Sequence, residues 1–337
     1  MHYKRLVLAL LASLPLLASA QSNVTIYGVA DAAVSREDTG APGASSQTRI
    51  NSGDQSSSRF GFRGTEDLGN GLKAMFNVEA GYAIDTGAGD AALFGRRSVV
   101  GLQGGFGSVT IGREYTPIAA VGAATDILGQ GFYGSNLSSF NANRLTRRIS
   151  NSVNYKSAPV SGFTGSAAYS AGEAATGPSG NLKGVALEYA SGPVYVGAGY
   201  HVLTRLASGD DKEYAVGAGY KAGDLEFKAN YMVGDQAGPN NKFEQVNLGA
   251  SMAFGPSKAF VNLQQNRTAN GAKGNAFTLA YSYSLSKRTN LYASYASLDN
   301  NNLGVFGLNA SGTSITPPAT APGADPSALT VGVRHTF

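Results

Sequence analysis

The chain has 337 residues, with 26 lysines and arginines against 22 aspartates and glutamates, and it contains no cysteine. The absence of a clustered basic excess argues against a nucleic-acid-binding protein, and the lack of cysteine excludes a small scaffold held by disulfides. Charged residues make up 14% of the sequence, well below the ~25% of soluble domains, and the 45 glycines are nearly double the usual share.

The first twenty residues have the layout of a secretory signal peptide. A basic start and an apolar run at 6–17 precede a small-x-small cleavage site at 18–20. The apolar run is too short to cross a bilayer as a helix, and Pro15 interrupts it. We therefore expect cleavage before Gln21, which leaves 21–337 as the mature chain.

Long runs of alternating apolar and polar side chains occur along the mature chain. Three of them lie at 72–82, 225–233 and 277–285, with a large or apolar residue at every second position. A strand points alternate side chains to opposite faces. The runs are about ten residues long, as a tilted strand needs to span a membrane, whereas average strands have about half that length. The runs predict transmembrane strands.

Turn signals divide these runs in a regular short–long rhythm. Seven tight connections alternate with longer stretches rich in Gly, Ser and Asn, near 37–56, 86–93, 118–146, 173–181, 204–211, 234–242, 267–274 and 299–326. This rhythm gives sixteen strands, and an even number places both termini on the periplasmic side. Short periplasmic turns and longer outer loops are typical of outer-membrane barrels. We predict an all-β fold, a 16-stranded antiparallel transmembrane β-barrel over 21–337.

Four segments carry short motifs that are specific when they are taken together. They are Gln21-Ser-Asn-Val-Thr-Ile-Tyr-Gly28, Ser58-Arg-Phe-Gly-Phe-Arg-Gly-Thr-Glu-Asp-Leu-Gly69, the segment 100–113 and Val331-Gly-Val-Arg-His-Thr-Phe337. Together they resemble the general trimeric Gram-negative porins of the beta-proteobacterial type. The resemblance implies a homotrimer in the bacterial outer membrane, forming a water-filled channel for passive diffusion of small hydrophilic solutes and ions. It further implies that the barrel-assembly machinery reads Phe337 as an assembly signal, and contact with lipid and lipopolysaccharide is expected of such a barrel.

Catalytic and metal-binding patterns are missing from the mature sequence. His201 and His335 are its two histidines, and neither has a Cys, His or carboxylate at ligand spacing. We expect no cofactor and no enzymatic activity. A membrane-embedded hydrolase remains an alternative that would need a His with a Ser or a carboxylate pair near the rim. A non-conducting adhesin or structural barrel would need a plug or larger loops than these.

Arginines alternate with aromatic residues near the start of the second motif. Arg59 and Arg63 occupy one face of the predicted strand, and Phe60 and Phe62 occupy the other. If the arginines faced lipid, each would cost ~2–4 kcal/mol near the midplane of the bilayer. We therefore predict that both arginines point into the channel.

Three further arginines are candidates for the channel wall. Arg148 lies at the same alternate positions of its strand as Ser150 and Ser152, so it is expected to point into the channel. Arg97 is an additional candidate for the channel wall. Alternation groups Arg113 with Val109 and Ile111, whereas resemblance to the porins places this arginine at the constriction. We follow the resemblance, because strands commonly bulge where a loop folds inward.

The stretch 118–146, after the fifth predicted strand, is the third outer loop. In the porin family the equivalent loop folds back into the barrel and narrows it, and the Gly, Ala and Asn content here suits an inward-folded segment. The loop offers Asp126, with Glu114 at its root, whereas cation-preferring relatives carry more acid there. The predicted constriction consists of Arg59, Arg63, Arg113, Arg148, Glu114 and Asp126.

These six residues have an excess of two positive charges. Asp31 lies on the polar face of the first predicted strand and would reduce the excess to one. Permeating ions pass the wall within the ~8 Å screening length of physiological salt. We therefore expect a weak preference for anions.

Overall fold

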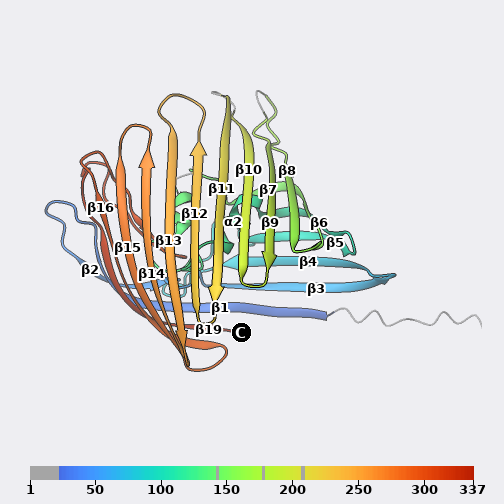
Figure 1. The fold of residues 1–337 in the computed structure, drawn as a ribbon, viewed down its shortest axis with the longest axis horizontal. Coiled ribbons are helices and arrows are strands. Elements are labelled where there is room, and N and C mark those ends of the chain that lie inside the picture. Colours follow the sequence, from blue (N-terminus) through green and yellow to red (C-terminus); the bar gives the residue numbers. More distant parts are fainter. Residues whose placement is uncertain (1–22, 142–143, 177–178, 206–208) are drawn as a thin grey trace, which may run out of the picture.

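The computed structural model describes residues 23–141, 144–176, 179–205 and 209–337 (Figure 1). The predicted signal peptide, residues 1–20, lies outside them. Within the described residues, no helix combines the length and the hydropathy that a membrane-crossing helix needs.

One antiparallel sheet closes on itself to form a barrel. In the described chain its wall has seventeen strands but sixteen strand positions, because two consecutive strands share one position. The strands are β1 (Asn23–Asp38), β2 (Gln47–Ser52), β3 (Arg59–Gly69), β4 (Leu72–Gly81), β5 (Arg97–Gly104), β6 (Gly107–Tyr115), β7 (Arg148–Lys156), β8 (Phe163–Ser170), β9 (Leu182–Ser191), β10 (Val194–Arg205), β11 (Gly209–Ala222), β12 (Leu225–Asp235), β13 (Lys242–Phe254), β14 (Ser257–Thr268), β15 (Lys273–Ser284), β16 (Thr289–Asn300) and β19 (Ser327–Thr336). The predicted 16-stranded barrel is confirmed.

The shared position belongs to β2 and β3, which both pair with β1 and are separated by 53–58. The predicted loop at 37–56 is therefore wrong in extent, since β1 continues to Asp38 and β2 begins at Gln47. Ile50 is the one large apolar residue in β2, so the strand lacks the alternation that marks the others. Backbone pairing with β1 holds it in the wall instead.

The wall strands are apolar outside and polar inside, as a membrane barrel with a wet interior requires. Leu248 and Leu263 pair across β13 and β14 and are each 54% exposed on the outer face. Their neighbours Asn247 and Asn262 are buried inside and joined by a hydrogen bond of 3.3 Å. Alternation along each strand produces this division directly.

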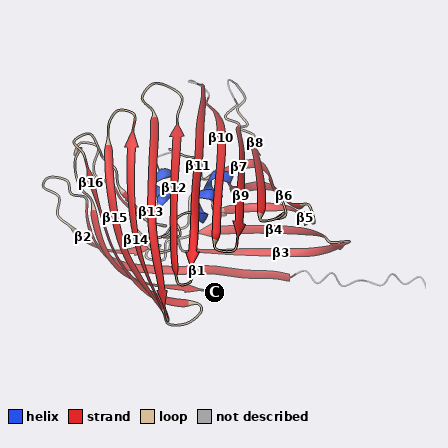
Figure 2. Cartoon of the chain, in the orientation of Figure 1, coloured by secondary structure: helices blue, strands red, loops and turns tan. Residues whose placement is uncertain are grey.

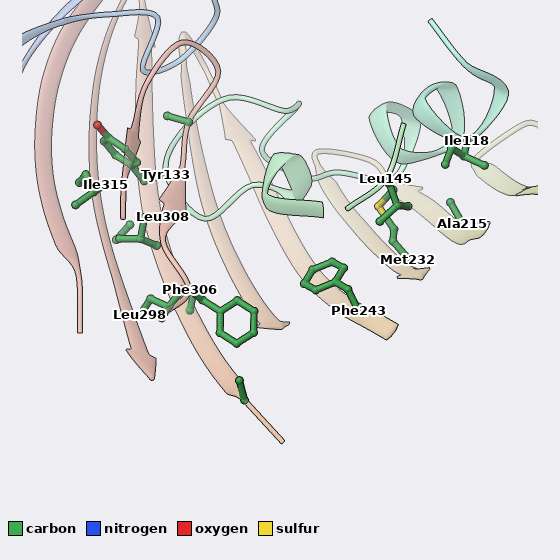
Figure 3. Close-up of a cluster of buried hydrophobic side chains, with 14 of the residues drawn as sticks. Ile118, Tyr133, Leu145, Ala215, Met232, Phe243, Leu298, Phe306, Leu308 and Ile315 are labelled. Carbon is green, nitrogen blue, oxygen red and sulfur yellow. The ribbon is translucent and has the colours of Figure 1, made fainter. Parts of the chain in front are cut away.

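The segment between β6 and β7 folds inside the barrel, where Figure 2 shows the helices against the strands. It contains α2 (Pro117–Ala124) and the 3₁₀ helix η1 (Asn136–Ser139). Ile118 and Tyr133 are fully buried, and Figure 3 shows Ile118 and Leu145 facing Ala215 and Met232 of the wall. The predicted inward fold of 118–146 is confirmed, and we call this part of the chain the inward segment.

The long connection between β16 and β19 also packs inward. It carries the short strands β17 (Leu308–Asn309) and β18 (Ser314–Ile315). Leu308 is fully buried in the cluster that includes Tyr133 (Figure 3). A hydrogen bond of 3.2 Å from the Ser135 hydroxyl to the carbonyl oxygen of Asn309 joins this connection to the inward segment.

The barrel closes where the two ends of the described chain meet. The Gly28 N–H donates to the Phe337 carbonyl oxygen at 3.0 Å, and the Phe337 N–H donates to the Gly28 oxygen at 3.1 Å. A Cβ atom at Gly28 would lie 2.3 Å from the Phe337 ring and 2.6 Å from the Arg59 carbonyl oxygen. Glycine is therefore required at this seam, which we call the closing seam.

Candidate channel constriction

A cavity of about 700 Å³ lies between the inward segment and the barrel wall from β1 to β9. Charged side chains line it on several strands. Among the described residues, the lining has six cationic side chains and three carboxylates. They are Arg59, Arg63, Arg96, Arg97, Arg147 and Lys156, with Glu79, Glu114 and Glu188. The lining therefore has an excess of three positive charges.

Two glutamates hold three arginines in place at the cavity wall. Glu79 on β4 accepts the Nε of Arg96 at 2.7 Å and lies 3.5 Å from the Nε of Arg59. Glu114 at the end of β6 accepts Arg97 through Nε at 2.9 Å and Nη2 at 2.6 Å. Both N–H groups donate to one oxygen, Oε2, whereas Oε1 of Glu114 accepts the backbone N–H of Tyr115 at 2.9 Å.

Other arginines at the cavity have no carboxylate partner among the described residues. Arg63 lies over the ring of Tyr27, with its Cζ 5.1 Å from the ring centre. Arg147, which precedes β7, donates from Nη2 to the Oε1 of Gln130 at 2.8 Å. Burial first, and repulsion by Arg148 second, lower the pKa of Arg147 to about 10. It stays protonated at neutral pH, so it contributes a full positive charge.

Tyr115 organises a further group of arginines. Its hydroxyl oxygen accepts the Nη2 of Arg148 at 2.6 Å and the Nη2 of Arg96 at 3.3 Å. The Cζ atoms of Arg148 and Arg147 lie 4.4 Å and 5.7 Å from its ring centre. An aromatic ring attracts cations to its face, so one phenol holds several arginines that would otherwise repel one another.

Three of the six predicted constriction residues line this cavity: Arg59, Arg63 and Glu114. Arg97, the additional lumen candidate, lines it too. Arg148 does not line it but packs on Tyr115, which does.

Arg113 lies elsewhere. It pairs with Ser98, two positions along from the pair of Val100 and Ile111, whose side chains are exposed on the outer face. Its guanidinium donates to the Gly95 carbonyl oxygen at 2.6 Å. The register shift between β6 and β7 falls at Arg113, between Gly112 and Glu114. A second hydrogen bond, from Nη1 to the Ser150 hydroxyl at 2.8 Å, holds the guanidinium, and Arg113 does not line the cavity.

The predicted carboxylate of the inward segment, Asp126, is 1% exposed and does not line the cavity. It accepts the backbone N–H groups of Leu128 at 2.8 Å and Asn136 at 2.9 Å, so it fixes the shape of the segment. Burial raises the pKa of Asp126 to about 6. Asp31 is also fully buried, and it accepts the hydroxyl of Tyr292.

Sequence reasoning missed Arg96, Arg147 and Tyr115. Arg96 and Arg147 each precede the first residue of a strand, β5 and β7. Alternation along a strand therefore predicts the direction of their neighbours Arg97 and Arg148, but it predicts no direction for Arg96 and Arg147. Each belongs to an adjacent Arg-Arg pair, and that pairing was the available signal.

Known proteins of similar sequence share this architecture. Residues 7–303 match the family model described as Gram-negative porin. Outer membrane porin protein 32 of Delftia acidovorans is 31% identical over 345 residues, which cover 95% of each chain. An outer membrane porin protein of Bordetella pertussis is 29% identical over 98% of this chain and 99% of its own. The solved structure of an anion-selective porin from Comamonas acidovorans superposes with a TM-score of 0.82 at 29% identity, covering 94% of this chain and 100% of its own.

Proposed function

The chain belongs to the Gram-negative porin family, and from that premise we propose that its channel favours small anions and anionic solutes over cations. It is an outer-membrane porin, a passive diffusion channel for small hydrophilic solutes and ions. The excess of three positive charges among the residues that line the cavity carries the proposal.

Electrostatics at short range supports a measurable preference. Ions that cross the cavity pass its wall within the ~8 Å screening length of physiological salt. Two unit charges 4 Å apart interact by ~1 kcal/mol even in water, which changes a partition several-fold. The anion-selective porin from Comamonas acidovorans has the same fold at 29% identity, and its selectivity supports the same sign here.

Reversal potentials across a planar bilayer with a KCl gradient test the proposal. We expect chloride to be several-fold more permeant than potassium, because an interaction of ~1 kcal/mol changes the partition of an ion into the cavity by about that factor. Arg59→Glu should reduce or reverse the preference, because Arg59 lines the cavity. Arg113→Glu makes the same charge change outside the cavity lining and should have a much smaller effect. A potassium preference in the unmutated channel would contradict the proposal.

We further propose the features that rest on resemblance. Residues 1–20 are a signal peptide that is removed before the mature chain 21–337 folds. The barrels form a homotrimer embedded among outer-membrane lipid and lipopolysaccharide. Phe337 acts as an assembly signal for the barrel-assembly machinery, and its seat in the closing seam supports a role in the last step of folding. We assign the chain no catalytic activity.

A further inference from the structure

Two buried side chains on neighbouring wall strands contact both ends of the inward segment. His201 on β10 and Glu213 on β11 are directly opposite each other in the sheet. They are 0% and 1% exposed, and neither lines the cavity. Ion selectivity therefore leaves both residues unexplained.

His201 holds the start of the inward segment. Helix α2 begins at Pro117, which has no N–H, and the next N–H group, of Ile118, has no partner within the helix. This N–H donates to the Nε2 of His201 at 3.2 Å. The Ala119 N–H is capped by the Thr116 hydroxyl, so His201 supplies the acceptor that the helix itself lacks.

Glu213 holds the end of the inward segment. Its two carboxylate oxygens accept the backbone N–H of Thr146 at 2.8 Å and the Thr146 hydroxyl at 2.7 Å. The Thr116 hydroxyl donates to the Thr146 carbonyl oxygen at 2.8 Å. Both ends of the segment are thus joined to each other and to one place on the wall.

The wall has a space shaped for this histidine. Gly184 on β9 is opposite His201 on its other side. A Cβ atom at Gly184 would lie 2.5 Å from the Cδ2 of the imidazole and 2.8 Å from its Nε2. Any larger residue at 184 would therefore push the ring away from the Ile118 N–H.

The contact requires one protonation state of His201. A backbone N–H can only donate, so Nε2 must be unprotonated and the neutral ring carries its hydrogen on Nδ1. Nδ1 faces the Oε2 of Glu213 at 3.5 Å. Strand β11 packs beside His201 and carries two carboxylates on the same face, Glu213 and Asp211. Asp211 is paired with Arg205 at 2.6 Å. Helix α2 brings no titratable residue, and β9 places glycine against the ring.

We propose that His201 and Glu213 are positioning residues that set the open width of the channel, and that His201 does so only when neutral. Protonation places an N–H on Nε2, opposite the Ile118 N–H, so the acceptor is lost. The start of α2 then leaves the wall. Pro117 and Ala120 on the other side of α2 line the cavity, so movement away from β10 narrows the channel.

Single-channel conductance in symmetric salt, recorded as the pH falls from about 8 to about 5, tests this inference, since imidazole ordinarily changes charge in that range. The unmutated channel should lose conductance on acidification. His201→Gln should keep its conductance at neutral pH and lose the acid response, because the Gln carbonyl accepts an N–H without titrating. His201→Ala should conduct poorly at every pH.

His335→Gln is the matched control, because His335 lies exposed on the outer face near the end of β19. It should respond to acid as the unmutated channel does. An acid response that persists in His201→Gln would overturn the inference, and so would an unmutated channel with no acid response. The measurement uses no salt gradient, so its outcome is separate from that of the selectivity test.

Discussion

A single tyrosine side chain arranges part of the positive charge at and beside the cavity. Tyr115 accepts hydrogen bonds from Arg96 and Arg148, and its ring lies against Arg147 and Arg148. Fixed dipoles and rings of this kind hold like charges together before any ion arrives, so a permeating anion meets an arrangement that needs no reorganisation. Glu79 and Glu114 neutralise part of that charge while leaving a net positive wall.

Asp126 leads to a prediction at the same scale. Its pKa is raised from 3.8 to about 6 by burial, so the folded segment favours the protonated carboxyl. The protonated carboxyl stabilises the folded inward segment fully below about pH 4. This stabilisation is lost as the pH rises through about 6, a change of roughly 3 kcal/mol in the free energy of unfolding. Hydrogen-exchange protection of the Leu128 and Asn136 amides should fall over that range.

Asp126→Asn should remove the pH dependence of this protection, because an amide side chain has no proton to lose between those pH values. Protection that increases with pH in the unmutated protein would show that the hydrogen bonds to the ionised carboxylate outweigh its burial.

At the scale of the elements, alternation decides how much can be read from the sequence. The run 277–285 alternates without a break, and its strand was predicted correctly. Alternation also groups Arg113 with Val109 and Ile111, and the structure leaves it out of the cavity lining, although resemblance to the family favoured the constriction. Arg96 and Arg147 stand outside the strands, so no alternation assigns their direction. Arg96 is held by Glu79 and Tyr115, and Arg147 by Gln130 of the inward segment, and no local pattern encodes these contacts.

The closing seam gives a prediction for the pairing of β1 with β19. Gly28→Ala would put a methyl group against the Phe337 ring and the Arg59 carbonyl oxygen, and overpacking of this kind costs about 1–3 kcal/mol. We expect a lower urea midpoint for the barrel refolded in detergent. Gly105→Ala, in the turn between β5 and β6 with open space around the position, should leave the midpoint unchanged. Equal urea midpoints for the two variants would mean that the closing seam accommodates the added methyl group without a loss of stability.

At the scale of the whole molecule, the interior of the barrel combines a polar inner face with apolar clusters, where the inward segment packs against the wall. The polar inner face holds that segment through hydrogen bonds from several strands, including those of Asn230 to Thr125 and Thr278 to Tyr133. The sequence predicted the barrel and the inward fold, because both follow from strand periodicity and from resemblance to the porins. The individual contacts depend on which residues meet across the lumen.

The channel as a whole should lose selectivity as salt increases. The screening length falls from ~10 Å at 0.1 M to ~3 Å at 1 M ionic strength. We expect the permeability ratio of chloride to potassium, taken from reversal potentials at a fixed concentration ratio, to approach unity at the higher salt. A ratio that does not change with salt would point to ion size or to direct anion binding rather than to the field of the wall.

The closing seam also determines the order in which this chain can fold. Strand β1 needs β19 as a neighbour, yet nearly the whole described chain separates the two in sequence. Until β19 arrives, the growing sheet has two edges with unpaired backbone groups, and such edges attract other strands. Pairing between distant segments is also slow. The unfinished barrel is therefore an aggregation-prone species, and the chain depends on being kept apart from its own copies until the ring is complete.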